Sequence, residues 1–338
     1  MKKILVTGGL GYIGSHTVVA LQEKGYEVVI VDNLANSQLE ILDRITKISG
    51  IKPIFEQLDL RDKPSVISLF EKYTDISGII HFAAFKAVGE SVAKPLDYYE
   101  NNLNTLIYLL QQVEIKKIPF IFSSSCTVYG EAEQMPIFEN APVQPAISPY
   151  GNTKQIGEEI VLDVAKSSEI KAILLRYFNP IGAHKSGLIG ELPNGVPQNL
   201  VPFITQTAIG KREKLSVYGN DYPTPDGTCI RDYIHVVDLA EAHVVSLERL
   251  LNNKNETAVE IFNLGTGKGS SVLEVIECFE KVTNQKLNYQ IVDRREGDVM
   301  QAYADTTKAR EVLGWQTRLG LGEALKSSWE WELAYNQS

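Results

Sequence analysis

The stretch "KILVTGGLGYIG" (residues 3–14) decides the fold of this chain. Residues 3–7 are mostly apolar or β-branched and predict a buried strand. The glycines that follow fit G-x-G-x-x-G at Gly9, Gly11 and Gly14. They also fit G-x-x-G-x-x-G, which starts at Gly8. A helix is predicted from residue 12 to residue 24. A strand, a glycine turn and a helix in this order are typical of a unit that binds a dinucleotide pyrophosphate at the helix N-terminus.

The second predicted strand, "EVVIVD" (27–32), ends in Asp32, eighteen residues past Gly14. A carboxylate at this place accepts hydrogen bonds from both adenosine ribose hydroxyls and repels a 2′-phosphate, so NAD is favoured over NADP. Asp59 ends the third predicted strand and has two open interpretations, a contact with the adenine ring or a cap on the next helix. Phe82, Ala83 and Ala84 follow the fourth strand, where they either border the cofactor or belong to the core.

The first half of the chain continues this alternation of strands and helices. Further strands are predicted over 52–59, 78–84, 119–125 and 171–179, and further helices over 38–49, 63–73, 95–114 and 149–166. Apolar strands that alternate with helices form a parallel sheet covered on both faces. The sequence therefore predicts an α/β fold, a doubly wound parallel sheet whose ligands lie at the carboxyl ends of its strands.

The alternation stops after Asn179, and residues 180–230 are rich in glycine and proline. Such a composition predicts loops that shape a binding site on a second, smaller α/β domain. Later helices are predicted over 201–210, 237–252, 271–283, 307–313 and 321–335. We expect an NAD-binding domain over residues 1–178 and a C-terminal substrate domain over 179–338.

The stretch "SPYGNTK" (148–154) places Tyr150 and Lys154 one helical turn apart, on one helix face. An unperturbed tyrosine has a pKa of about 10, and a nearby cation favours its phenolate. We expect Lys154 and the charge of an oxidised nicotinamide to lower the Tyr150 pKa, so that Tyr150 acts as general acid and base on an alcohol. Ser125, the last of three serines at the end of the fifth strand, would share the proton. The alternative is a packed aromatic residue beside a polar strand end.

Composition excludes several functions. The chain has 33 basic and 42 acidic residues, a net charge of −9, so we expect no binding to nucleic acid or to an anionic membrane. Cys126, Cys229 and Cys278 are far apart and odd in number, which predicts no disulfide framework, and the histidines show no metal-binding spacing. We expect no metal site. No run of about twenty apolar residues is present, so we expect no membrane span and a cytoplasmic protein.

Four motifs together resemble the extended short-chain dehydrogenase/reductase family: T-G-x-x-G-x-x-G, "SSSCTVYG" (123–130), "SPYGNTK" and "RYFNPIGAH" (176–184). Within that family the chain is most similar to enzymes that interconvert UDP-glucose and UDP-galactose. The resemblance covers essentially the whole chain and includes residues 218–240, 262–272 and 294–299.

The resemblance implies that resident NAD oxidises C4 of the sugar, that the 4-keto sugar rotates, and that C4 is then reduced from its other face. It implies three catalytic residues, Tyr150, Lys154 and Ser125. The implied cofactor contacts are Gly8, Gly11, Tyr12, Ile13, Gly14, Asp32, Asn33, Leu34, Asn36, Ser37, Asp59, Leu60, Phe82, Ala83, Ala84, Lys86, Asn101, Ser125, Tyr150, Lys154 and Phe178. The implied substrate contacts are Lys86, Ser125, Tyr150, Asn179, Asn199, Leu200, Ser216, Val217, Tyr218, Arg231, Arg295, Asp298 and Ala302.

Three positions depart from the family pattern. "NNLNTL" (101–106) lacks a glycine, which leaves the register after Asn102 open, and Cys126 stands where some relatives have alanine. A bulky tyrosine that narrows the sugar pocket in relatives restricted to plain hexoses falls on Ala302. We therefore expect the UDP-N-acetylhexosamines to be interconverted as well. A shift of one residue would bring Tyr303 into the pocket instead.

Competing functions remain open at this stage. A nucleotide-sugar 4,6-dehydratase needs an Asp-Glu pair after the strand-five hydroxyl residues, and this chain has Cys126 and Thr127 there. A nucleotide-sugar dehydrogenase would release NADH, and a non-catalytic NAD-sensing protein would not turn over. The resemblance also implies a homodimer formed through the helices at 95–114 and 149–166.

Overall fold

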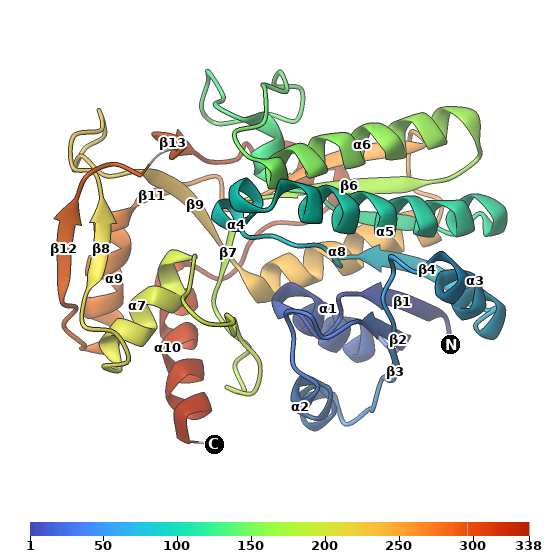
Figure 1. Cartoon of the computed structure of the whole chain (residues 1–338), viewed down its shortest axis with the longest axis horizontal. Helices are drawn as coiled ribbons and strands as arrows, with labels where there is room; N and C mark the ends of the chain where they lie inside the picture. Colours follow the sequence, from blue (N-terminus) through green and yellow to red (C-terminus); the bar gives the residue numbers. More distant parts are fainter. Residues whose placement is uncertain (296, 338) are drawn as a thin grey trace. The chain divides into compact units, whose positions relative to one another are not determined.

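The computed structural model describes residues 1–295 and 297–337, and its chain forms two compact units (Figure 1). Unit 1 comprises Met1–Gly130, Pro142–Tyr177 and Ala240–Phe262. Unit 2 comprises Glu131–Ala141, Phe178–Leu239 and the chain from Asn263 onward. Each unit is described below by itself.

Unit 1 is built on a seven-stranded sheet with the order β10-β6-β5-β4-β1-β2-β3. Its strands are β1 (Lys3–Thr7), β2 (Glu27–Asp32), β3 (Ile54–Gln57), β4 (Ile76–His81), β5 (Phe120–Ser123), β6 (Ala172–Tyr177) and β10 (Val259–Leu264). β1 pairs in parallel with both β2 and β4, so the strand order reverses at β1. The predicted doubly wound parallel sheet is confirmed, and its ligand crevice is expected at the carboxyl ends of β1 and β4.

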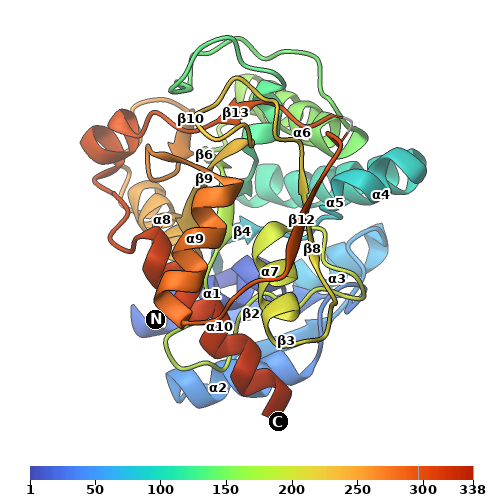
Figure 2. The ribbon, with the colours of Figure 1, turned by 90° about the vertical axis from the view of Figure 1, so that its left-hand side faces the viewer.

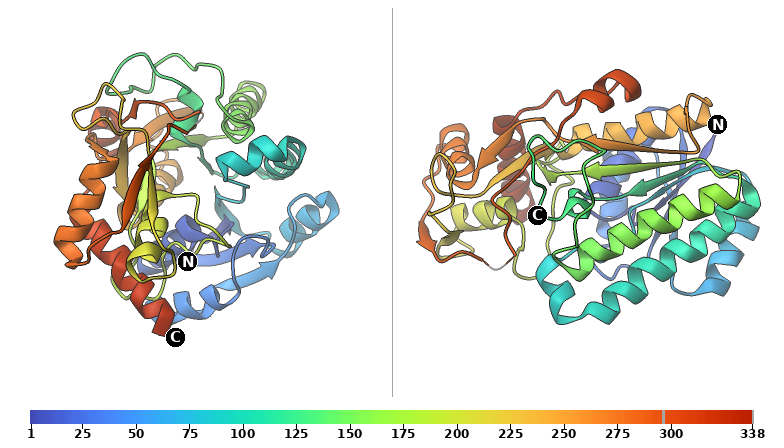
Figure 3. Two further views of the ribbon diagram at one scale, coloured as in Figure 1. Left: turned by 60° about the vertical axis from the view of Figure 1, so that its left-hand side comes forward. Right: turned by 90° about the horizontal axis from the view of Figure 1, so that it is seen from above.

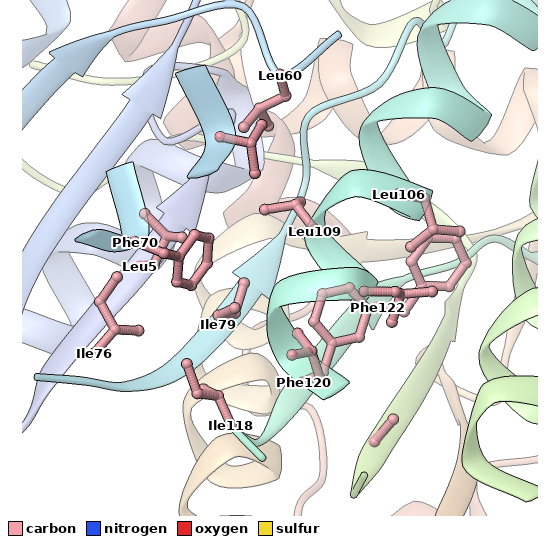
Figure 4. Packing of buried hydrophobic residues seen from close by; sticks show 14 of the residues in the cluster. Leu5, Leu60, Phe70, Ile76, Ile79, Leu106, Leu109, Ile118, Phe120 and Phe122 are labelled. Atoms are coloured by element: carbon pink, nitrogen blue, oxygen red, sulfur yellow. The ribbon is translucent and has the colours of Figure 1, made fainter. Parts of the chain in front are cut away.

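Helices cover both faces of this sheet. They are α1 (Tyr12–Glu23), α2 (Glu40–Ser49), α3 (Lys63–Lys72), α4 (Val88–Ala93), α5 (Pro95–Lys116), α6 (Pro149–Ser167) and α8 (Val236–Leu251), which starts in unit 2. The right-hand view of Figure 3 shows α5 and α6 side by side on one face. Their apolar residues enclose a core with the sheet, in which Leu109 of α5 lies near Ile79 of β4 and Phe120 of β5 (Figure 4).

The predicted domain boundary at residue 178 differs from the structure in two segments. The chain leaves unit 1 after Tyr177, but Ala240–Phe262 returns to unit 1 and Glu131–Ala141 lies in unit 2. The return has a physical reason, because the apolar run 259–264 forms the sheet edge beside β6 and α8 covers the sheet. Gly78 of β4 has no side chain and leaves room for Leu247 of α8.

Unit 2 is centred on strand β9 (Ile230–His235). β9 pairs in parallel with β7 (Asn179–Ile181) and β13 (Gln301–Ala302), and antiparallel with β11 (Gly269–Ser271). A separate parallel pair is formed by β8 (Leu215–Tyr218) and β12 (Tyr289–Val292). The helices α7 (Leu200–Ala208), α9 (Val272–Thr283) and α10 (Leu321–Gln337) surround a second core, with α9 beside α10 (Figure 2).

Several sequence-based boundaries were wrong. Residues 180–230 were expected as loops around one helix, yet they also contain most of β7 and all of β8. Their apolar residues pack into the second core, which composition alone does not reveal. The helix predicted over 307–313 is confirmed and is π-helical over Ala309–Leu313, whereas α4 was not predicted. The strand predicted over 119–125 ends at Ser123.

Candidate active site

The glycine turn joins β1 to α1 and requires glycine at two positions. Gly8 has a φ of +67°, and a Cβ there would lie 2.9 Å from the backbone nitrogen of Ala83. A Cβ at Gly14 would overlap the carbonyl oxygen of Gly8. The first turn of α1, which begins at Tyr12, carries no acidic side chain. The turn is therefore a narrow cradle whose N–H groups and helix dipole favour a pyrophosphate, so the residues present fit a dinucleotide.

Asp32 organises the turn after β2. Its carboxylate is buried and accepts hydrogen bonds from the Leu10 nitrogen (3.1 Å), the Leu34 nitrogen (3.0 Å) and the Ser37 hydroxyl (2.7 Å). A carboxylate offers about four acceptor sites, so capacity remains for a ribose hydroxyl. Leu34 has a φ of +60°, which bulky residues adopt at a cost of about 1–2 kcal/mol. Such strained residues are concentrated at ligand-binding turns.

The rest of this turn and the end of β3 are arranged around side-chain contacts. Asn33 accepts a hydrogen bond from the backbone nitrogen of Ala35 at 3.0 Å. Asp59 accepts two bonds from the Arg61 guanidinium, which holds the pKa of Asp59 below its usual value. The N-cap of α3 is Asp62, so Asp59 does not cap this helix. Leu60 is buried in the core of unit 1.

The segment after β4 runs beside the glycine turn. The Ala83 nitrogen donates to the Thr7 hydroxyl at 3.3 Å, and the Lys86 ammonium lies 5.9 Å from the ring centroid of Tyr12. Phe82 packs against His243, with ring centroids 4.6 Å apart. The structure therefore brings the predicted cofactor residues of β1, α1 and β4 to one edge of the sheet.

Asn102 is a residue that the sequence analysis did not select. Its amide is buried and uses all four of its hydrogen bonds. The oxygen accepts from the Phe85 nitrogen (2.8 Å) and the Asn101 amide (2.9 Å), and the nitrogen donates to the Phe85 oxygen and the Thr153 hydroxyl, both at 3.0 Å. Thr153 in turn donates to the Tyr150 carbonyl oxygen at 2.7 Å. Asn102 thus ties the segment after β4 to the helix that carries Tyr150.

The three consecutive serines at the end of β5, Ser123 to Ser125, have three different partners. The Ser123 hydroxyl bonds the Tyr177 hydroxyl at 2.6 Å, and the Ser124 hydroxyl donates to Glu158 at 2.5 Å. Ser125 caps the following 3₁₀ turn, accepting from the Thr127 nitrogen at 3.2 Å, and a hydrogen bond from Ser125 also acts on Tyr150. Of the three serines, Ser125 is the one whose hydroxyl faces the Tyr150 phenol.

Tyr150 and Lys154 lie in the first turns of α6, whose N-cap is Ser148 and whose first residue is Pro149. Both side chains are buried, and the Lys154 ammonium lies 6.0 Å from the ring centroid of Tyr150. Lys154 donates to the Ser123 carbonyl oxygen at 2.7 Å. The predicted shared helix face is thus present.

In the polypeptide alone the Tyr150 pKa is raised, whereas the expected lowering includes the charge of an oxidised nicotinamide and stays a prediction. Burial and the neighbouring Tyr177 raise the Tyr150 pKa, and the Ser125 hydrogen bond offsets only part of this rise. Burial also lowers the pKa of Lys154 to about 8, against the attraction of Glu158. The reason is that desolvation disfavours the charged form of both side chains.

The predicted nucleotide-binding residues of unit 2 lie on several elements. Asn179 is in β7, and Asn199 precedes α7 and donates to Glu191 at 2.6 Å, with Leu200 as the first helical residue. Ser216, Val217 and Tyr218 are in β8, and buried Phe178 donates to the Leu264 oxygen at 3.1 Å. Tyr218 is 43% exposed, and the guanidinium of Arg295 lies 5.5 Å from its ring centroid.

Two arginines of unit 2 share one carboxylate. Arg295 donates to Asp298 through two nitrogens, at 3.1 and 2.6 Å, and Arg231 approaches the same carboxylate at 3.9 Å. Two arginines on one carboxylate, with Arg295 also beside the exposed ring of Tyr218, suit a nucleoside diphosphate.

Ala302 and Tyr303 lie on opposite faces of the β9 sheet. Ala302 is the register partner of Arg231, whereas the Tyr303 ring faces Gly269, the partner of Asp232. Buried Asp232 holds this arrangement, since it accepts from the nitrogens of Ala304 (3.2 Å), Thr266 (2.8 Å) and Gly267 (3.1 Å). In the structure Ala302, and not Tyr303, lies on the arginine side.

Fold and site together define a doubly wound α/β protein with a dinucleotide-binding turn and a buried Tyr-Lys pair. A family model described as GDP-mannose 4,6 dehydratase matches residues 5–328. The chain is 52% identical over 333 residues to a UDP-glucose 4-epimerase of Bacillus subtilis, covering 97% of this chain and 96% of the relative. The chain belongs to this family of nucleotide-sugar enzymes, and the predicted resemblance is confirmed.

Solved structures agree with this relationship. A UDP-glucose 4-epimerase from Stenotrophomonas maltophila with bound NAD and formylated UDP-arabinopyranose has a TM-score of 0.95 and 44% identity, covering 100% of this chain and 99% of that chain. A UDP-Glc/GlcNAc 4-epimerase from Campylobacter jejuni has a TM-score of 0.85 and 36% identity, covering 99% of this chain and 100% of that chain.

Among residues 1–295 and 297–337, no helix combines the length and apolar character that a bilayer crossing requires. Within the same ranges, no group of three or more His, Cys, Asp or Glu side chains is arranged to hold a metal ion.

Proposed function

We propose that this chain interconverts UDP-glucose and UDP-galactose by inverting C4 of the hexose with resident NAD. The observation that carries this function is the position of the Tyr150 phenol beside Ser125. Both lie in unit 1, where the carboxyl ends of the sheet strands also form the dinucleotide cradle. The near full-length identity to UDP-glucose 4-epimerases supports the same activity.

Bound NAD supplies reversible hydride exchange at C4 of the sugar. Tyr150 takes the proton of the 4-hydroxyl group while C4 is oxidised, and Ser125 hydrogen-bonds the same oxygen. After the 4-keto sugar has rotated, C4 is reduced on its opposite face and Tyr150 returns the proton to the 4-oxygen. Because the reaction starts and ends with the alcohol, its net redox change is zero and the cofactor does not need to leave.

The raised pKa of Tyr150 suits one half of this cycle and opposes the other. Burial keeps the phenol protonated, which favours the return of the proton to the sugar. The removal of the proton needs positive charge close to the phenol. Lys154, buried 6.0 Å from the Tyr150 ring centroid, supplies that charge as long as it is protonated.

For the nucleotide, Arg231 and Arg295 bind the diphosphate, and Tyr218 stacks on the uracil. The Arg295 side chain is 54% exposed, so its pair with Asp298 can open toward a phosphate at little cost. The residues that complete this proposed site of unit 2 are Asn179, Asn199, Leu200, Ser216, Val217 and Asp298. Lys86, in unit 1, is assigned to the sugar by the family resemblance alone. The cofactor contacts implied by the resemblance are proposed to bind NAD. They include Tyr12, Ile13, Asn36, Ala84 and Asn101.

Ala302 widens the sugar pocket, and UDP-N-acetylglucosamine and UDP-N-acetylgalactosamine are also substrates. This proposal is supported by the register of β13, which pairs Ala302 with Arg231 and turns the Tyr303 ring toward Gly269. The Campylobacter jejuni neighbour is named for both the glucose and the N-acetylglucosamine substrates.

The dehydratase alternative is disfavoured although the matching family model has a dehydratase description. Elimination of water needs a carboxylic acid and a base after Ser125, and the chain has Cys126 and Thr127 there. Neither side chain can supply the acid.

We infer in addition that the protein forms a homodimer through α5 and α6 in the cytoplasm. Leu96, at the start of α5, is 79% exposed, and Ile115 near its end is 72% exposed. Sedimentation of the wild type and of Leu96→Glu tests this association.

The experiment is an incubation of purified protein, without added cofactor, with UDP-galactose and separately with UDP-N-acetylgalactosamine, followed by chromatography of the products. Both glucose-configured products are expected. UDP-glucose alone would remove the Ala302 argument, and no product, even after addition of NAD, would remove the epimerase. Stoichiometric release of NADH would indicate a dehydrogenase. Tyr150→Phe should keep NAD bound and stop turnover. A non-catalytic NAD-sensing protein would show no turnover in the wild type either.

A further inference from the structure

Three side chains one helical turn apart line the buried face of α6. Tyr150, Lys154 and Glu158 follow each other at intervals of four residues, and all three are at most 8% exposed. The proposed function uses the first two. Glu158 is an acidic side chain buried beside the active site without an assigned role.

Glu158 is held in place by a buried network. Arg176 of β6 donates to both carboxylate oxygens, with its shortest bond from Nη2 to Oε2 at 2.6 Å, and both side chains are 5% exposed. The Ser124 hydroxyl donates to Oε1 at 2.5 Å. Arg176 also donates to the Tyr129 hydroxyl at 3.0 Å. A carboxylate with these partners keeps its charge and cannot swing away from α6.

The surroundings of Lys154 contain few charges that could balance its ammonium. On α6 itself, the titratable side chains one helical turn from Lys154 are Tyr150 and Glu158. Further titratable groups lie around these three side chains. His81 of β4 interacts with Lys154, Arg176 of β6 pairs with Glu158, and Tyr98 of α5, Cys126 of the 3₁₀ turn and Tyr177 of β6 interact with Tyr150. Burial, with the charge of Lys154, lowers the pKa of His81 to about 3, so this imidazole is neutral. Glu158 is the member of this set that carries a negative charge at neutral pH.

The uncharged contacts of Lys154 are limited. Its ammonium donates to the Ser123 carbonyl oxygen at 2.7 Å and lies 5.0 Å from the ring centroid of Phe122. Burial works against the charge and lowers the Lys154 pKa to about 8, and Glu158 is the group that opposes this shift. An ammonium buried beside one carbonyl oxygen and the rings of Phe122 and Tyr150 is stabilised in its charged form by a nearby anion.

We propose that Glu158, oriented by Arg176 and Ser124, is a positioning residue that stabilises the ammonium form of Lys154 and thereby sets the upper pH limit of catalysis. The part of this inference that concerns turnover rests on the proposed epimerase function, whereas the charge state of Lys154 can be measured without it. Glu158 acts through Lys154 and does not touch the sugar.

The direct test is an NMR titration of the protein carrying ¹³C-labelled lysines, with the Lys154 signal assigned by its loss in Lys154→Arg. The wild-type midpoint is expected near pH 8. In Glu158→Gln the midpoint should fall by about one pH unit or more, because a neutral amide no longer favours the ammonium. Glu159→Gln is the matched control, since this exposed neighbour loses the same charge on the solvent side and should leave the midpoint unchanged.

Glu158→Gln alone leaves the Arg176 guanidinium buried without its anion, which can prevent folding. Glu158→Gln/Arg176→Met removes both charges and keeps the side-chain volume, and its Lys154 midpoint should still lie below that of the wild type. An unchanged midpoint in the double variant would overturn the inference. A purely structural role would lower stability and leave the midpoint where it is.

The same variants are then assayed for epimerisation of UDP-galactose between pH 6 and pH 10. The alkaline limb of kcat should move to lower pH by the same amount as the NMR midpoint, while Glu159→Gln follows the wild type. If the wild type turns over but the Lys154 midpoint does not move in the variants, the role of Glu158 is rejected and the epimerase proposal stands. A moved midpoint in a protein without turnover supports that role and rejects the proposed epimerase.

Discussion

Ala302 and Arg231 are register partners on the parallel strands β13 and β9, so their side chains lie on the same face of the sheet in unit 2. The neighbouring Tyr303 ring points to the other face, toward Gly269. A larger side chain at residue 302 therefore extends beside a proposed phosphate-binding arginine. A smaller side chain at residue 303 changes only the opposite face of the sheet.

Ala302→Tyr tests this geometry. Turnover of UDP-N-acetylgalactosamine should fall by about 10-fold to 200-fold, the range by which pocket shape discriminates substrates, while UDP-galactose turnover is retained. The measurement is kcat/KM for both substrates. Tyr303→Ala is the control and should leave their ratio unchanged, and a loss of both activities in Ala302→Tyr would contradict the pocket argument.

Lys154→Met keeps the length of the side chain and removes its charge. Because the phenolate of Tyr150 then loses its nearby cation, kcat should fall by about 100-fold or more. Steady-state kinetics measures this loss, and bound NAD is quantified on the same sample. Lys166→Met, on the same helix with its side chain 75% exposed, should retain wild-type kcat. Equal kcat in the wild type and in Lys154→Met would mean that Lys154 has no catalytic role.

Asn102→Leu removes an amide that makes four buried hydrogen bonds. Each buried partner left without a bond costs about 1–3 kcal/mol, so the free energy of unfolding should fall by at least that amount. Urea denaturation measures it. Asn104→Leu, on a half-exposed position of the same helix, should change stability by less than about 0.5 kcal/mol. Similar losses in both variants would remove the special role of Asn102.

His81 should make the protein less stable in acid. Burial, with the charge of Lys154, lowers its pKa to about 3 in the folded state, below the unfolded value of about 6.5. Between these values the unfolded chain binds a proton that the folded chain does not, so stability falls as pH falls from 6.5. Each such proton contributes a slope of about 1.4 kcal/mol per pH unit.

The test compares urea unfolding of wild type and His81→Phe between pH 7 and pH 5, where the variant should show a smaller slope. His235, whose pKa burial lowers to about 4, contributes in the same direction and remains in both proteins. Equal slopes in His81→Phe and wild type would show that His81 is not the source.

The parts of the site that were predictable rest on local spacing. Gly8 and Gly14 are required by the geometry of one turn, Asp32 by its place at the end of the next strand, and Tyr150 and Lys154 by one turn of a helix. Glu158 repeats that spacing and could have been found by extending it. Its partner Arg176 lies on another strand, and Asn102 is joined to Phe85 and Thr153 across the fold, so neither contact leaves a local signal.

The sequence by itself determined the class of the sheet, the alternation of its first six strands with helices, and the residue types that bind a dinucleotide and move a proton, because these depend on periodicity and short-range spacing. Only the tertiary structure decided that residues 240–262 return to the first sheet, that Ala302 shares a face with Arg231, and that burial raises the Tyr150 pKa. The physical reason is common to all three. Strand pairing between distant segments and the loss of water around a side chain depend on the packing of the folded chain, which no short stretch of residues specifies.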